Sequence, residues 1–188
     1  MINWRAALVL VAVLVGLAVY AFQSRPQPST TKPSPALFPC AATDAVELRL
    51  TGVDGKVTDL HLSSSGTDWQ LTAPSAAPAD QAAVSDLLLT AGQLRSSATL
   101  AAVPSGQDLG LSPPRLTVDC FLRKGASYTL TIGGQNFDGS GSYARVSGDS
   151  RVHLIPSAAV QKFQKVLVEP PIRPYPSPAG SPSPSPSA

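Results

Sequence analysis

Apolar and polar residues alternate with a period of two in several stretches of the chain, a pattern typical of strands that are buried on one face. The first is AVELRLTGVDGKVTDLHL, residues 45–62. Its apolar positions are Val46, Leu48, Leu50, Leu60 and Leu62. Asp54-Gly55 lies between its halves and suits a tight turn, because glycine adopts positive φ without steric cost. We therefore expect a β-hairpin here.

A third strand and a helix follow in DWQLTAPSAAPAD and the residues after it. Trp69 and Leu71 share one face of the expected strand, and Pro74 ends its pairing because proline has no N–H to donate. Asp80 stands at the N-cap of the helix. The apolar stripe of that helix has helical spacing: Val84, Leu87, Leu88, Ala91 and Leu94. Trp69 is expected to be buried where helix and sheet meet.

The second half is again rich in strands. Residues 115–134 predict a hairpin that turns near Lys124-Gly125, and residues 136–156 predict another that turns at 147–149. Ser157 is the expected cap of a second helix, with Val160, Phe163, Val166 and Leu167 as its apolar stripe. About seven strands and two helices indicate an α+β fold, with antiparallel meanders and both helices on one face. The expected core includes Trp69, Leu71, Leu87, Leu88, Leu111, Leu130 and Ile132.

Both ends of the chain differ from this compact region. Residues 6–22 carry no charge and predict a membrane helix, with a cleaved signal peptide as the alternative. Either would place the domain outside the cytoplasm, whereas the basic residues on the two sides are too balanced to fix the orientation. We expect an anchor or signal at 1–24, a Pro/Ser/Thr-rich spacer at 25–42, the domain at 43–169 and a disordered Pro/Ser-rich tail at 170–188.

The charge balance argues against nucleic acid as a partner. Residues 43–170 hold 12 acidic and 10 basic residues, a net charge of −2, because four of the 14 basic residues lie outside this region. Neither a basic stripe nor a run of aromatic residues is present there, and nucleic-acid binding would call for both.

Candidate chemistry is sparse, and the sequence predicts neither catalytic residues nor a cofactor or metal site. His61 and His153 each lie on an expected strand and are interpreted as sheet-surface residues without further ligands at suitable spacing. The glycine-bearing loops near residues 110 and 133 lack a P-loop lysine. Asp138 and Asp149 could pair as catalytic carboxylates across neighbouring turns, although the side chain of an aspartate in a turn usually hydrogen-bonds to the backbone.

Cys40 and Cys120 are the only two cysteines. In an exported domain they could form a disulfide that ties the end of the spacer to the sheet. The alternative is two free thiols, with Cys120 as a small core residue.

Several of these segments, taken in order, resemble the bacterial domain-of-unknown-function 4340 family. They are a Trp-x-Leu strand, a proline and an Ala-Asp helix start, a Gly-Leu-x-x-Pro step, an Ile-Gly turn and a Tyr-x-Arg strand. The matching residues are Trp69, Leu71, Pro74, Ala79, Asp80, Gly110, Leu111, Pro114, Ile132, Gly133, Tyr143 and Arg145. The resemblance covers about residues 45–169. It implies a single-span membrane protein with an external domain, in some members associated with ABC-type transport systems, and it implies no catalytic residues. The chain departs from the pattern in its single copy of the domain and in its Pro-Ser tail.

The sequence therefore favours a membrane-anchored accessory module of the bacterial envelope, with the membrane contacted through residues 6–22 and another envelope protein as partner. The alternative is a surface enzyme or carbohydrate-binding domain that uses the face around Phe137 and Tyr143.

Overall fold

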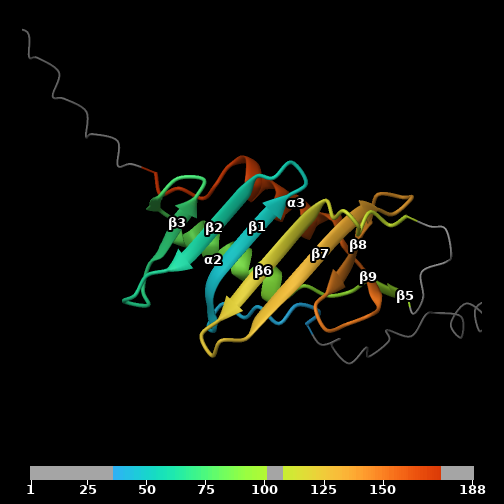
Figure 1. Ribbon diagram of the computed structural model, residues 1–188, viewed down its shortest axis with the longest axis horizontal. Coiled ribbons are helices and arrows are strands. Elements are labelled where there is room, and N and C mark those ends of the chain that lie inside the picture. The colour runs from blue at the N-terminus through green and yellow to red at the C-terminus, as the bar shows by residue number, and fades with distance from the viewer. Residues whose placement is uncertain (1–35, 101–107, 175–188) are drawn as a thin grey trace, which may run out of the picture. The chain divides into compact units, whose positions relative to one another are not determined.

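The computed structural model describes residues 36–100 and 108–174, which form one antiparallel sheet with two helices. The elements are β1 (Ala45–Gly52), β2 (Val57–Leu62), β3 (Trp69–Ala73), β4 (Ala77–Pro78), α2 (Gln81–Gly92), β5 (Ala98–Leu100), β6 (Leu116–Leu122), β7 (Ser127–Gln135), β8 (Gly141–Val146), β9 (Val152–Pro156) and α3 (Ser157–Val168). The nine strands lie in the order β4-β3-β2-β1-β6-β7-β8-β9-β5 (Figure 1). The expected α+β class and antiparallel meanders are confirmed.

Strands β1 and β6 pair in the middle of the sheet, although about 70 residues separate them in the sequence. The three expected hairpins are present, and their turns contain Gly55, Gly125 and Gly148 at positive φ. Sequence analysis missed β4 and β5, which have two and three residues. Strands this short contain too few positions to display an alternation.

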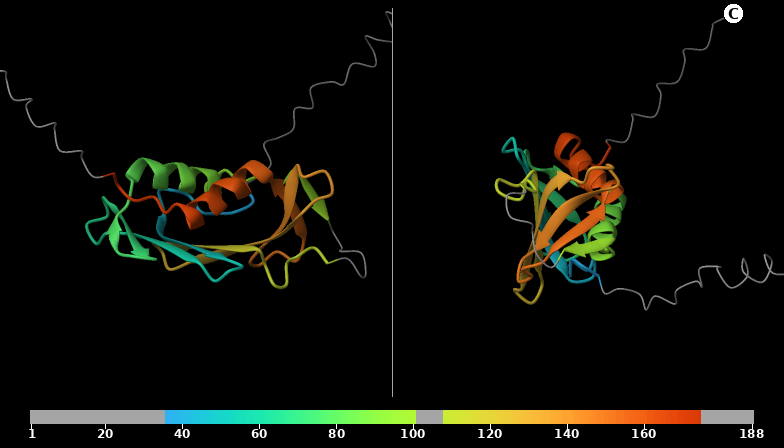
Figure 2. Two further views of the ribbon diagram at one scale, coloured as in Figure 1. Left: turned by 90° about the horizontal axis from the view of Figure 1, so that it is seen from above. Right: turned by 90° about the vertical axis from the view of Figure 1, so that its right-hand side faces the viewer.

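Both helices cover the same face of the curved sheet and leave the other face open (Figure 2). The stripe expected for α2 is buried, including Leu94 just beyond the end of the helix. Asp80 is the N-cap, as expected: its carboxylate accepts hydrogen bonds from the backbone N–H groups of Ala82 and Ala83 at 2.9 and 3.2 Å. This contact satisfies two of the donors that a helix leaves free at its start.

The start of α3 differs from the prediction. Ser157 is the first helical residue and Pro156 occupies the N-cap position, without a side-chain cap. The Ser157 hydroxyl instead donates to the carbonyl of Ser140, at 3.1 Å, across the end of the β8–β9 hairpin. The apolar stripe of α3 faces the sheet as expected, with Val160 and Phe163 buried and Val166 packed against the core.

Six of the seven expected core residues are buried, and Leu111 is the exception. Leu111 lies between β5 and β6, where it forms an isolated bridge to Pro114, and it is only half-buried. The nearby Leu109 is buried in its place. The loop leaves the plane of the sheet here, so that strand alternation does not apply.

Ordered packing extends past both expected boundaries of the domain. Phe38 and Cys40, assigned to the spacer, are fully buried. A Cβ on Gly92 would lie 2.7 Å from the Cys40 carbonyl oxygen, so the glycine in α2 permits close approach of the incoming chain. Residues 170–173, assigned to the tail, return beside residues 78–80 through backbone hydrogen bonds.

Cys40 and Cys120 form a disulfide, with their Cα atoms 5.9 Å apart. Both residues are fully buried. The bond joins the segment before β1 to β6 in the middle of the sheet, which confirms the pairing that the sequence left open.

The membrane segment expected at residues 6–22 and the tail beyond residue 174 lie outside the described residues. Among the residues that the structure describes, no helix is both long and apolar enough to cross a bilayer.

Candidate functional site

An open hollow of about 350 Å³ lies where the β5–β6 loop meets β7 and β8. Its polar lining comes from Asp108, Arg115, Gln135 and the half-buried ring of Tyr143. Phe137, the other aromatic residue expected on this face, is fully exposed in the β7–β8 turn and does not line the hollow. The two rings therefore do not converge on one binding surface.

Two glycines fix the floor of this hollow. A Cβ on Gly133 would lie 2.3 Å from the Leu109 carbonyl oxygen, and Gly110 has a positive φ of 67°. The N–H of Gly134 donates to the same Leu109 carbonyl at 2.7 Å. Close contact between the backbones of the β5–β6 loop and of β7, rather than a phosphate cradle, accounts for the glycines at both positions.

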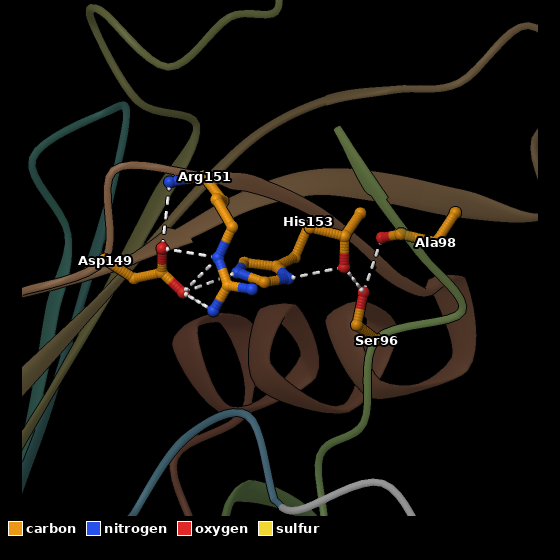
Figure 3. A network of polar contacts seen from close by, with 6 residues as sticks. Ser96, Ala98, Asp149, Arg151 and His153 are labelled. Atoms are coloured by element: carbon orange, nitrogen blue, oxygen red, sulfur yellow. Dashed lines mark hydrogen bonds and ion pairs between the residues drawn. The ribbon is translucent and has the colours of Figure 1, made fainter. Parts of the chain in front are cut away.

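A second polar cluster lies at the β9–β5 edge around His153 (Figure 3). Its ring nitrogens lie 3.2 Å from the Thr99 hydroxyl and 3.1 Å from an Asp149 carboxylate oxygen. Arg151 donates to Asp149 through both its backbone N–H and its guanidinium. His153 is 4% exposed, so its expected place on the sheet surface is wrong. It lies in β9 directly opposite Thr99 of the neighbouring edge strand β5.

The order of hydroxyl, imidazole and carboxylate at this edge also occurs in catalytic triads. Two observations favour a structural role here. Asp149 is already bound by Arg151 in a bidentate contact, at 2.8 and 3.0 Å. His153 is only 4% exposed, so its ring has little access to a substrate. The cluster fastens the short β5 to β9.

A third cluster lies on the open face of the sheet, on the paired strands β1 and β2. Arg49 donates to Glu47 Oε1 at 2.9 Å and to Asp59 Oδ2 at 3.1 Å. The other oxygen of each carboxylate faces His61 Nε2, at 3.4 Å for Asp59 and 3.7 Å for Glu47. The hydrogen bond to Asp59, followed by the attraction of its charge, raises the pKa of Arg49, so the guanidinium stays charged.

Comparison with protein families identifies the chain. The model of the family described as Domain of unknown function (DUF4340) matches residues 69–167, more than half of the chain. The chain belongs to this family. No curated protein matches the chain, and no solved structure matches it.

Residues that carry the DUF4340 resemblance meet around the first hollow. Gly110 and Tyr143 line it, and Gly133 touches Gly110 beneath it. Ile132 and Gly133, expected to form a turn, instead lie within β7, next to a shift in its register. The Gly-Leu-x-x-Pro step and this Ile-Gly pair are thus two sides of one backbone contact. Strands β1 and β2 precede the matched residues, yet they lie between β3 and β6 in the sheet. In this chain, the folded domain therefore includes residues before Trp69.

Sequence analysis missed the third cluster, although the necessary signal was present. Asp59 and His61 are two apart and so share a face, and the Asp54-Gly55 turn sets Glu47 opposite His61. The contacts of His153 had no comparable signal, because β5 was not recognised and Thr99 is 54 residues away. The suggested pairing of Asp138 with Asp149 is not seen, since each binds groups in its own turn.

The pKa of Asp149 lies well below its usual range, chiefly because the Arg151 guanidinium and backbone N–H donate to it. Arg151→Gln is expected to raise this pKa toward the ordinary value of about 3.9. The pairing stabilises the folded state above about pH 4, and its contribution is lost as the pH falls through the lower folded-state pKa. A carboxyl ¹³C NMR titration measures the change.

Asp138 supplies an internal control in the same titration. Its pKa is also lowered, by hydrogen bonds from Ser140, which the Arg151 substitution does not touch. An Asp149 pKa that stays unchanged in Arg151→Gln would show that the guanidinium is not its main partner.

Proposed function

We propose that the chain is a membrane-anchored, extracytoplasmic accessory module of the bacterial envelope that binds another envelope protein. The observation that carries this proposal is the buried Cys40–Cys120 disulfide. Structural disulfides form and persist in oxidising compartments and are rare in the cytosol of mesophiles. The uncharged residues 6–22 supply the anchor in this proposal, and the proline-rich residues after them supply the spacer.

Further support comes from the polar groups of the domain. In the described residues, Asp149 and His153 hold a strand edge, and Lys162 pairs with Asp86 between the two helices. These are contacts that stabilise a fold. A binding role needs no further chemistry from these groups, and a subunit of an ABC-type transport system is the partner we propose.

The location is tested by thiol trapping in growing bacteria. Cells expressing the full chain are quenched with acid and treated with a maleimide of high mass, with and without prior reduction. We expect no adduct on Cys40 or Cys120 without reductant and two adducts after it. The matched control lacks residues 1–24, stays in the cytoplasm and should carry two adducts without reductant. Two free thiols in the full chain would contradict the proposed location.

Orientation is tested separately with an epitope placed after Ala188. External protease should remove the epitope from intact spheroplasts while a cytoplasmic marker survives. Protection of the epitope until lysis would overturn the extracytoplasmic placement. Mild cross-linking, followed by capture in detergent, tests the partner. Recovery of a transport subunit is expected, and its consistent absence would leave the association with transport without support.

The hollow beside Tyr143 favours a second candidate, a carbohydrate-binding domain. Its volume of about 350 Å³ is near the lower end of small-molecule sites. Tyr143 could stack against a sugar ring, with Asp108 and Arg115 as hydrogen-bonding groups. NMR titration with envelope glycan fragments distinguishes the candidates: shifts confined to the hollow, and lost in Tyr143→Ala, would favour carbohydrate binding.

A further inference from the structure

We propose that Glu47, Asp59 and His61 bind one divalent transition-metal ion of the zinc type on the open face of the sheet. One atom from each residue lies within 4.8 Å of one from each of the others. The three residues lie on two paired strands, with Glu47 directly opposite His61. Their backbone positions are therefore fixed by the sheet, whatever the partner of the domain.

Asp59 supplies the observation that points to a ligand. Its Oδ1 atom is buried and has no hydrogen-bond partner in the described structure, and the residue is only 8% exposed. A buried carboxylate oxygen without a partner is costly, because it has lost its water without replacement. This atom faces His61 Nε2, at 3.4 Å. A cation between them would satisfy the oxygen.

The spacing suits tetrahedral coordination. With metal–ligand bonds of about 2.0–2.1 Å, neighbouring ligand atoms around zinc lie about 3.3 Å apart. His61 Nε2 lies 3.4 Å from the Asp59 oxygen and 3.7 Å from the Glu47 oxygen. The ligand atoms of Glu47 and Asp59 lie within 4.8 Å of each other. Side-chain rotations that draw the two carboxylates together would complete the tetrahedral set. The His61 side chain is 41% exposed, which leaves a fourth position open to water.

Arg49 orients the two acidic ligands. It holds one oxygen of each carboxylate and leaves the second oxygen of each directed at His61. Partners of this kind behind a metal ligand fix its direction and typically change affinity by about 10–100-fold. Two carboxylates and one guanidinium leave the site with a net charge of −1 before the metal binds, so a divalent cation remains electrostatically favoured.

The ligand set also selects the class of ion. Imidazole and carboxylate groups both occur as ligands of zinc and related transition metals, and imidazole suits zinc, copper, iron and nickel. Calcium and magnesium prefer sites made of six or more oxygens, including retained water. The family match begins at Trp69 and therefore excludes all three ligands. All three ligands thus come from β1 and β2, which precede the matched residues.

The test uses the full chain, purified in detergent with a tag that lacks histidine and stripped of metal by dialysis against a chelator. Isothermal titration with zinc chloride is expected to give one saturable site per chain. His61→Ala should weaken binding at least about tenfold, because it removes the only nitrogen ligand. The half-exposed His61 can be truncated without leaving a buried cavity. Glu169→Gln, which removes an exposed carboxylate on the C-terminal side of α3, should bind zinc as the wild type does.

A second readout locates the metal. Zinc should shift the imidazole ¹⁵N signals of His61 and leave those of the buried His153 unchanged. Asp59→Asn provides a further variant if circular dichroism shows that it folds. Absence of saturable binding, undiminished binding in His61→Ala, or shifts at His153 instead of His61 would each overturn the proposal.

Discussion

Reduction of the Cys40–Cys120 disulfide is expected to lower the free energy of unfolding by up to about 4.5 kcal/mol. The sequence separation of 80 residues makes the closed loop long, so the bond removes much conformational freedom from the unfolded chain. Chemical denaturation followed by circular dichroism, with and without a phosphine reductant, measures the difference.

A variant that carries both Cys40→Ala and Cys120→Ala is the matched control. It should be less stable than the oxidised wild type, with an added cost from the two fully buried sulfur positions. Reductant should have no further effect on it. A wild-type stability that does not change on reduction would show that the bond does not stabilise the protein by restricting the unfolded chain.

Truncation of Trp69 to alanine is expected to cost about 3–5 kcal/mol, as for other large buried aromatic residues. Trp69 is 7% exposed and belongs to the same core cluster as Leu71 and Leu88. Its backbone is also held from the helix: Gln81 accepts a hydrogen bond from the Trp69 N–H at 2.8 Å and donates one to the Trp69 carbonyl at 3.0 Å. Equilibrium denaturation of the two proteins gives the difference.

Gln70 is the natural comparison, because it is exposed on the opposite face of the same strand. Gln70→Ala should change the free energy of unfolding by about 0.5 kcal/mol or less. A Trp69→Ala cost below about 1 kcal/mol would instead assign the tryptophan to a surface role.

Local patterns were sufficient to predict most of the fold. The hairpins around Gly55, Gly125 and Gly148 each combine an alternating run with a turn residue, and the capped α2 combines Asp80 with a helical stripe. These signals lie within about 20 residues of one another. Because each element has one apolar face, these faces pack together. The expected core residues Trp69, Leu130 and Ile132 are therefore buried.

Features that depend on distant contacts were less accessible. Leu111 is apolar and was expected in the core. However, the loop that contains it packs through Gly110 against Gly133 of β7, and Leu111 is only half-buried. His153 alternates with apolar residues as a surface residue would, yet it is buried and contacts Thr99 of the short neighbouring strand β5. The Glu47–His61 pair could have been predicted from the sequence, because the register of the β1–β2 hairpin alone brings the two residues together.

The disulfide also determines which part of the domain could bear mechanical load. If the chain is pulled between its two ends, tension passes from Cys40 through the sulfur atoms to Cys120 and bypasses the residues between them. Strands β1 to β5, helix α2 and residues 116–119 of β6 lie in this shielded loop, so only the residues before Cys40, the end of β6 and the elements after it can unravel. Breaking the bond would release roughly 270 Å of additional chain, at about 3.3–3.6 Å per residue. A reductant in the envelope would thereby set how far the domain can extend under force.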